Sequence, residues 1–258
     1  MNVTKGRQER PWRIILSGTN GVGKSTWAAA MPKPLFIDLE NGTHHLDVDR
    51  VYSETYPEFL DTVIALCEEK HDYKTLVVDS LDWLETLIHT SVVQDVSKKE
   101  PNIKEVSDIG YGRGYNHALG KLNHTLAQFD QVVAKGIGVC LICHTHIVQR
   151  QDPLLEDYGV YELKLHHKAA ARAKEWCDFL LFANFVRRTA STGDGFKKRS
   201  RAFGDNSRVL HTSGSSGFEA KSRRPIMNAD GEPELPLEFS AFKEAYQQAF
   251  KGEKTDAA

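Results

Sequence analysis

One short stretch constrains this chain more than any other. Residues 18–25 read Gly-Thr-Asn-Gly-Val-Gly-Lys-Ser and fit the phosphate-binding pattern G-x-x-x-x-G-K-[ST] without a mismatch. The apolar run before it, at 12–16, has the character of a β-strand, and residues 25–30 are typical of the first turns of a helix. A phosphate-binding loop requires this strand–loop–helix context, so we expect the chain to bind a nucleotide.

Each residue type in the loop has a chemical task. Glycines let backbone N–H groups curl around phosphate oxygens, and the helix N-terminus adds the positive end of its dipole. Lys24 is expected to reach the β- and γ-phosphates, and the Ser25 hydroxyl to hold Mg²⁺. The chain has no N-K-x-D guanine signature, so ATP is the expected nucleotide. The residues predicted to bind it are Gly18, Thr19, Asn20, Gly21, Val22, Gly23, Lys24, Ser25 and Thr26.

The length of 258 residues suits one α/β domain with, at most, a small appendage. We expect a flexible leader over 1–11, one domain over 12–251 and a frayed tail over 252–258. No apolar run is long enough to span a bilayer, and the leader lacks the apolar core of a signal peptide. A cytoplasmic protein without membrane association is therefore expected.

Charge is unevenly distributed along the chain. The net charge is −2, yet residues 164–224 hold 14 Lys and Arg against 5 Asp and Glu. Such a block indicates a surface that faces a polyanion such as nucleic acid, with a solvated basic hairpin as the alternative.

The four cysteines are Cys67, Cys140, Cys143 and Cys177. In a cytosolic chain they are not expected to form disulfides. Residues 140–144 match the haem-attachment string C-x-x-C-H, but they lie in an apolar strand-like run. Residues three apart on a strand face opposite ways, so core cysteines are the preferred interpretation.

Strand-like and helical patterns alternate along the first two thirds of the chain. Expected strands lie at 34–40, 74–80 and 137–143; expected helices lie at 57–69, 81–96, 115–135, 166–176 and 240–250. Surface loops are expected at 97–114 and 145–160, and short antiparallel strands at 178–185, 196–203, 207–211 and 217–220. The pattern predicts a three-layer α/β sandwich with a mainly parallel sheet and an antiparallel C-terminal extension. A ligand would bind at the carboxyl edge of the sheet.

Acidic residues end two of these strands. Asp79 follows the apolar run Leu76-Val77-Val78 and is expected to hold Mg²⁺, with a helix-capping role as the alternative. Glu40 is the candidate base that orients the attacking water, unless it merely faces solvent. Period-two alternation places Asp38 on the same face as Glu40, which makes Asp38 a second candidate metal ligand.

Three further residues are candidates for catalysis. His144 is expected to end its strand, where it could bond the γ-phosphate and report its loss to the next loop; a simple strand-end histidine is the alternative. Lys221 and Arg223 share one face of an extended segment and could reach a neighbouring subunit's γ-phosphate. A solvated basic edge strand is the other interpretation.

With these residues assembled, the chain resembles RecA-type P-loop ATPases, and most of all the phage-encoded nucleotide-binding proteins of that fold that act in single-strand annealing and recombination. The resemblance covers about 12–225 and includes the motifs at 18–25, 36–40 and 76–80 together with His144 and 220–223. It implies that Glu40 activates water, that His144 stands where the family often has Gln, and that Lys221 and Arg223 act between subunits. It also implies contact of the two predicted loops with single-stranded DNA, a homo-oligomeric ring or short filament, and a single-strand DNA-binding protein as a candidate partner.

The favoured interpretation is therefore a DNA-stimulated ATPase in recombination or annealing, with Tyr111 and Tyr115 as candidate base-stacking groups. A hexameric helicase or loader would share every ATP residue. A small-molecule kinase would need an Arg-rich lid, whereas the middle loop offers only Arg113. A non-enzymatic nucleotide-gated partner is the remaining alternative.

Overall fold

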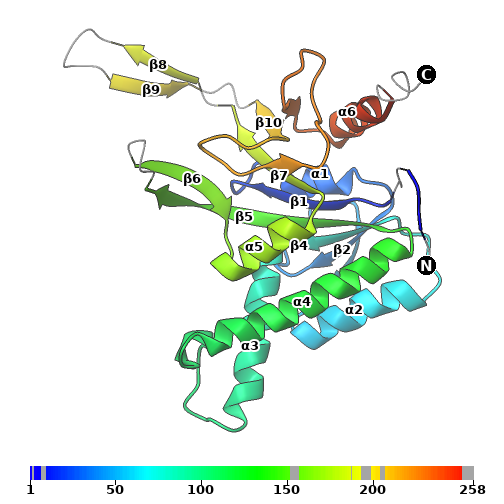
Figure 1. Cartoon of the computed structure of the whole chain (residues 1–258), viewed down its shortest axis with the longest axis vertical. Helices are drawn as coiled ribbons and strands as arrows, with labels where there is room; N and C mark the ends of the chain where they lie inside the picture. The colour runs from blue at the N-terminus through cyan, green and yellow to red at the C-terminus, as the bar shows by residue number, and fades with distance from the viewer. Residues whose placement is uncertain are drawn as a thin grey trace. The chain divides into compact units, whose positions relative to one another are not determined.

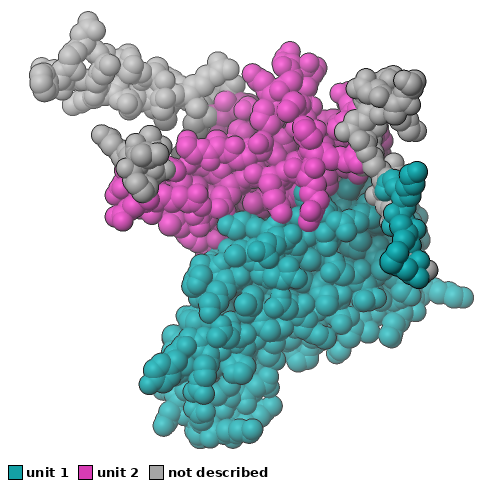
Figure 2. Space-filling view, in the orientation of Figure 1, with its two compact units in different colours: residues 1–15, 31–142, 165–178 teal, residues 16–30, 143–164, 179–258 magenta. Residues whose placement is uncertain are grey.

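A computed structural model describes residues 1, 3–6, 10–151, 157–186, 188–192, 199–203 and 207–251. The chain divides into two compact units, which Figure 2 colours separately. Unit 1 comprises residues 1–15, 31–142 and 165–178; unit 2 comprises residues 16–30, 143–164 and 179–258. Two strands, β1 (Arg13–Gly18) and β5 (Gly138–Arg150), begin in unit 1 and end in unit 2. Among the described helices, none combines the length and the apolar character that crossing a membrane requires.

Unit 1 contains a parallel sheet. Its strands are β2 (Pro34–Asp38), β3 (Asp49–Tyr52), β4 (Thr75–Asp79) and the first residues of β5, in the order β3-β2-β4-β5. All residues of β4 are buried, as expected for a strand in the middle of a covered parallel sheet. Asp38 and Asp79 are register partners, so the carboxyl ends of β2 and β4 lie side by side.

Helices cover this sheet (Figure 1). They are α2 (Tyr56–Glu68), α3 (Leu81–Ser97), the short 3₁₀ helix η1 (Val106–Asp108), α4 (Arg113–Ala134) and α5 (His167–Trp176). Thr55 caps α2 by accepting a hydrogen bond from the Glu58 N–H, which meets the need of a helix N-terminus for acceptors. Helix α4 packs against α2, α3 and α5. Phe129 on α4 meets Phe59 edge to face, with ring centroids 6.1 Å apart.

The N-terminal segment is held by an ion-pair cluster in unit 1. Asp178 accepts hydrogen bonds from Arg10 and Arg13, and Arg13 also pairs with Asp130 at 3.1 Å. Burial alone would raise the pKa of Asp178, but the two guanidinium groups hold that pKa below its usual value. Arg10, which lies in the predicted leader over 1–11, thus makes a specific contact with Asp178.

Unit 2 is built from antiparallel strands and two helices. The strands are β6 (Tyr158–Leu163), β7 (Phe179–Phe185), β8 (Arg188–Thr192), β9 (Arg199–Phe203), β10 (Arg208–His211), β11 (Lys221–Ser222) and β12 (Glu234–Pro236). Strand β7 pairs with β10 and β11, and β10 pairs with β12, while β8 pairs with β9 and β6 with the end of β5. The helices are α1 (Lys24–Ala29) and α6 (Phe239–Lys251).

Aromatic side chains form the core of unit 2. Trp27 of α1 lies edge-on to Phe239 and Phe242, at centroid distances of 5.3 and 5.7 Å. Phe179 of β7 meets Phe242 at 5.6 Å. Burial of these rings fastens α1, and with it the residues before α1, to β7 and α6.

The predicted fold class is confirmed: the protein has a mostly parallel α/β sheet with an antiparallel C-terminal part. Cys140, Cys143 and Cys177 are buried, as the core interpretation predicted, whereas Cys67 is only half-buried. The predicted tail at 252–258 lies outside the described residues, as do 196–198 of one predicted strand.

Two predicted segments differ from the structure. The strand expected to end at His144 continues to Arg150, and 145–150 pair with β6, so the described part of the predicted loop 145–160 is a hairpin. Its β-branched residues Thr145, Ile147 and Val148 favour the extended backbone that the ladder then satisfies. The strand predicted at 217–220 is also wrong, because the two-residue β11 follows it instead. Residues 152–156 of the hairpin lie outside the described residues.

Candidate nucleotide-binding site

The phosphate-binding loop connects β1 to α1 within unit 2. Lys24 is the first residue of α1 and its side chain folds back over the loop, donating hydrogen bonds from Nζ to the carbonyl oxygens of Gly18 at 3.0 Å and Thr19 at 3.1 Å. Lys24 is only 5% exposed. The ammonium group is thus held in place before any ligand arrives, which lowers the entropy that phosphate binding would cost.

Two glycines in the loop cannot be replaced without strain. Gly23 has a φ of 106°, a left-handed conformation that residues with a Cβ rarely adopt. A Cβ on Gly18 would lie 2.3 Å from the carbonyl oxygen of Ala183 on β7, which is far inside van der Waals contact. The motif's glycines therefore serve both the loop's shape and its close approach to the neighbouring strand.

The loop also has unused hydrogen-bonding capacity. Thr19 Oγ1 is buried and has no hydrogen-bond partner in the part of the chain that the structure describes. An unpaired buried hydroxyl is costly and is usually satisfied by a ligand or water. Together with the glycine backbone and Lys24, this donor set fits the polyphosphate of a nucleotide, and Ser25 in the same loop is the predicted ligand of its Mg²⁺.

Unit 1 carries a group of acidic side chains at the carboxyl ends of β2 and β4. Ser80, the residue after β4, donates a hydrogen bond from Oγ to Glu40 Oε1. Asp82, in the first turn of α3, has a carboxylate oxygen within 4.8 Å of one on Glu40. Asp79 and Asp82 are both 7% exposed. The carboxylates of Glu40 and Asp82 are close enough to share a cation.

Asp38, the second candidate metal ligand, accepts several hydrogen bonds from the turn after β2. Its Oδ1 accepts hydrogen bonds from the N–H groups of Glu40 and Gly42, and its Oδ2 accepts from the N–H and hydroxyl of Thr43 at 2.9 and 2.6 Å. Burial would raise the pKa of Asp38, but these bonds lower it, led by the Thr43 hydroxyl. Both carboxylate oxygens thus accept hydrogen bonds, and Asp38 orders the turn that carries Glu40.

The other predicted catalytic residues lie in unit 2. His144 is within strand β5, where its carbonyl accepts from the N–H of Lys164 at 2.9 Å. Lys221 is in β11, opposite Leu180 of β7, and Arg223 is the first residue after that strand. Ser222 between them bonds the Thr212 carbonyl through its hydroxyl, at 2.9 Å. The extended segment predicted for Lys221 and Arg223 is therefore present only in part as a paired strand.

The sequence analysis does not identify two further residues: Asp82, which lies near Glu40, and Arg208, which lies beside the phosphate-binding loop. Asp82 follows Asp79 by three residues, and this D-x-x-D spacing across a strand-to-helix junction was the available signal. Arg208, the first residue of β10, has Nη1 2.8 Å from the point that a Cβ on Gly23 would occupy. No local pattern links residues 23 and 208, since only the fold brings β10 to the loop.

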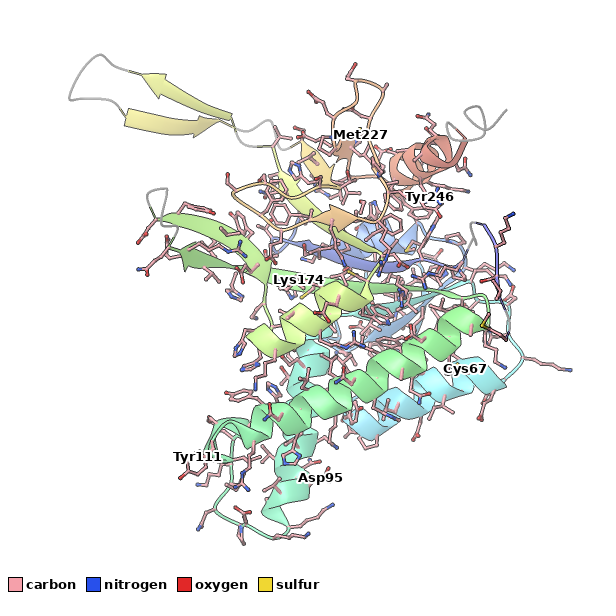
Figure 3. The ribbon with its side chains drawn as sticks, viewed as in Figure 1. Cys67, Asp95, Tyr111, Lys174, Met227 and Tyr246 are labelled. Carbon is pink, nitrogen blue, oxygen red and sulfur yellow. The ribbon has the colours of Figure 1, made fainter. Side chains whose placement is uncertain are left out.

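The two candidate stacking tyrosines differ sharply. Tyr115 is stacked on His166, with ring centroids 4.1 Å apart and planes 6° from parallel. Tyr111 is 103% exposed and precedes α4 with a φ of 57° (Figure 3). Only Tyr111 presents both ring faces to solvent, which leaves it able to stack on a base.

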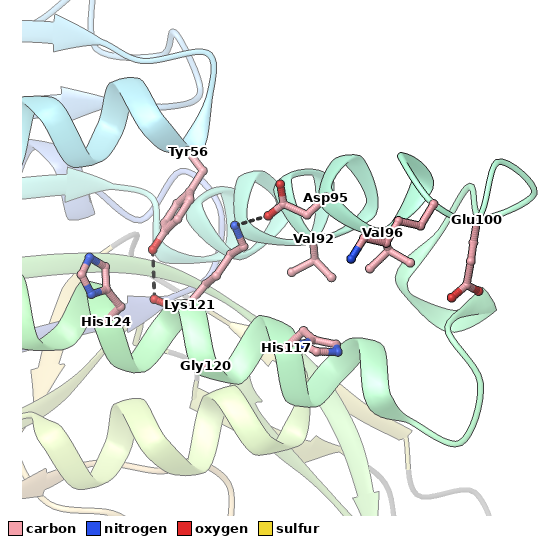
Figure 4. Close-up of a pocket in the computed structure, with 10 residues that line it drawn as sticks. Tyr56, Val92, Asp95, Val96, Glu100, His117, Gly120, Lys121 and His124 are labelled. Atoms are coloured by element: carbon pink, nitrogen blue, oxygen red, sulfur yellow. Dashed lines mark hydrogen bonds and ion pairs between the residues drawn. The ribbon is translucent and has the colours of Figure 1, made fainter.

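A cavity of about 600 Å³ lies in unit 1 between α3, α4 and Tyr56 of α2 (Figure 4). Lys121 Nζ at its wall bonds Asp95 Oδ2 and Ser91 Oγ, both at 2.9 Å, and lies 5.3 Å from the Tyr56 ring centre. None of the residues predicted to bind nucleotide lines this cavity. It is therefore separate from the phosphate-binding loop.

Comparison with known proteins adds three findings. A family model described as an AAA domain matches residues 10–224. No curated protein matches the sequence. One similar solved structure is titled "Crystal structure of the RadB recombinase"; it shares 13% sequence identity, with 83% of this chain and 91% of that chain covered, at a TM-score of 0.41.

Proposed function

We propose that this chain, which belongs to the AAA domain family and carries a complete phosphate-binding motif, is a RecA-like ATPase that hydrolyses ATP and acts on single-stranded DNA in recombination or strand annealing. The observation that carries the ATP assignment is the loop itself: a complete phosphate-binding motif with Lys24 already held over it and an unpaired hydroxyl on Thr19.

In the proposed reaction, the loop N–H groups and Lys24 bind the β- and γ-phosphates. Mg²⁺, held by Ser25 and Asp79, would neutralise phosphate charge. Water attacks the γ-phosphorus, its proton passes to the Glu40 carboxylate, and the bond from that phosphorus to the β–γ bridging oxygen breaks to release ADP and phosphate. The Ser80 hydroxyl that donates to Glu40 Oε1 supports this role, because it orients the carboxylate.

The distribution of charged residues supports contact with a polyanion, but at a segment outside the two predicted loops at 97–114 and 145–160. Residues 97–114 hold four basic and three acidic side chains, and 145–160 hold one basic and three acidic. The one arginine of the second segment, Arg150, pairs with Glu162 and Glu219, both at 2.8 Å. Residues 187–203, which include the β8–β9 hairpin, hold six basic and one acidic residue. We therefore propose that this basic stretch of the sequence, 187–203, makes most of the phosphate contacts.

The test is ATP hydrolysis with and without single-stranded DNA at two salt concentrations. Stimulation that fades as salt rises is expected, because phosphate contacts release counterions. Turnover that is indifferent to DNA would contradict the DNA part of the proposal, and turnover that requires a small acceptor would indicate a kinase instead.

Tyr111→Ala is expected to weaken single-stranded DNA binding by roughly ten-fold, since stacking of one base on an aromatic ring contributes about 1–3 kcal/mol. ATP turnover without DNA should not change, because the side chain is fully exposed at the turn before α4. Fluorescence anisotropy with a labelled oligonucleotide measures the effect. Tyr111→Phe is the matched control and should bind normally; equal affinity of the Ala variant would remove Tyr111 from the DNA surface.

The proposed assembly is a homo-oligomeric ring or short filament in which Lys221 and Arg223 reach the γ-phosphate of a neighbouring subunit. Lys221→Ala and Glu40→Gln should each be inactive alone. Mixing them should restore part of the turnover, because some interfaces then pair an intact Lys221 with an intact Glu40. Titration of one variant against the other measures this rescue. Mixed oligomers that assemble but stay inactive would place Lys221 outside the interface.

Three further points stay predictions: a single-strand DNA-binding protein as partner, phage origin and cytoplasmic location.

A further inference from the structure

Arg208 lies against the phosphate-binding loop in unit 2. Its Nη1 is 2.8 Å from the point where a Cβ on Gly23 would lie, and Cδ2 of Leu237 is 3.9 Å from the same point. The contact exists because Gly23, the residue immediately before Lys24, has no side chain. A residue from β10 thus adds a permanent positive charge to the loop that the motif already supplies with Lys24.

The position of this guanidinium is held by its neighbours. Arg208 and Phe185 are cross-strand partners in the β7–β10 ladder, and Arg208 Cζ lies 5.9 Å from the centre of the Phe185 ring. The Arg208 carbonyl accepts from the N–H of Leu237 at 3.3 Å. Backbone pairing and a cation–π contact therefore orient the side chain from a rigid strand rather than from a loop.

The positive charge at this position favours binding of an anion. Among the residues that the structure describes, no carboxylate pairs with Arg208. Lys24 and the loop N–H groups make the same surroundings positive, so a second cation there is unfavourable unless a ligand neutralises it. A guanidinium binds phosphate oxygens with two parallel hydrogen bonds, which a lysine cannot do.

We infer that Arg208 is a nucleotide-binding residue that contacts the polyphosphate of ATP bound to the loop of the same chain. The inference rests on the proposed ATP-binding function and adds to it a cation supplied by β10. It differs from Lys221 and Arg223, whose proposed action is on a neighbouring subunit. Arg208 would thus confer a preference for nucleotides with more phosphates.

The experiment is calorimetric titration of the full chain with ATP, ADP and adenosine. Arg208→Gln should raise the Kd for ATP by about ten- to a hundred-fold, the usual effect of losing a charge-assisted hydrogen bond, and leave the Kd for adenosine within about two-fold. Arg208→Lys should recover part of the affinity. The matched control is Arg150→Gln, which removes another exposed arginine of unit 2 and should bind ATP like the wild type.

The outcomes separate this inference from the proposed function. If the wild type binds ATP and Arg208→Gln binds it equally well, Arg208 has no part in binding. If adenosine affinity falls as much as ATP affinity, Arg208 contacts the base, and the polyphosphate assignment is wrong. If the wild type itself binds no ATP, the proposed function fails first, whatever the variants do.

Discussion

Lys24→Ala is expected to abolish ATP hydrolysis, with a loss of at least about a hundred-fold in turnover, since removal of one pre-organised donor from a transition state typically has that effect. The Lys24 side chain is buried, at 5% exposure, and donates hydrogen bonds to two loop carbonyls. Alanine would remove the charge that stabilises the transferring phosphoryl group and would leave the carbonyls of Gly18 and Thr19 without this donor. Steady-state phosphate release at saturating ATP measures the result.

A suitable control is Lys33→Ala, which removes an exposed lysine that forms a surface ion pair with Asp72. Exposed ion pairs contribute little to folding stability, so this variant should fold and hydrolyse ATP normally. Thermal unfolding of both variants shows whether Lys24→Ala still folds. A folded Lys24→Ala protein with wild-type turnover would refute the assignment of the loop as the catalytic nucleotide site.

The parts of the fold that were predictable from the sequence are those governed by local pattern. The motif at 18–25 can be identified directly, and α1 begins within it at Lys24. The predicted bounds of β4 and of the amphipathic helix α4 lie close to the observed ones, because burial and helical periodicity are patterns among neighbouring residues. The extension of β5 beyond His144 was missed, because its pairing with β6 depends on partners across an intervening segment. Long-range register is not visible in a local window.

The candidate site shows the same limit at the level of single residues. Asp38 and Glu40 look equivalent in the sequence, two acids on one strand face, yet four hydrogen bonds commit Asp38 to the turn while Ser80 orients Glu40. Arg208 is distant from Gly23 in sequence and reaches it only through the pairing of β10 with β7. Residue type and spacing thus identify which side chains could act, and the hydrogen bonds decide which are available.

Glu40→Gln should separate binding from chemistry. The substitution keeps the size of the side chain, and the amide oxygen can still accept the hydrogen bond from Ser80 Oγ, so the turn should not change. It removes the charge and the ability to take a proton from water. We expect turnover to fall by about a hundred- to a thousand-fold, within the range attributed to general-base catalysis, with the Kd for ATP changed by less than about three-fold.

Single-turnover hydrolysis and equilibrium ATP binding, measured on the same preparation, test this. Ser80→Ala is the informative companion, because it leaves the Glu40 carboxylate intact but removes its orienting donor, and it should lower turnover less than Glu40→Gln while sparing ATP affinity. Asp82→Asn tests the neighbouring carboxylate, which lies within 4.8 Å of Glu40. If Glu40→Gln loses ATP binding together with turnover, Glu40 belongs to the metal site. If only Asp82→Asn stops turnover while ATP binding stays intact, Asp82 is the general base, and Glu40 serves to position it.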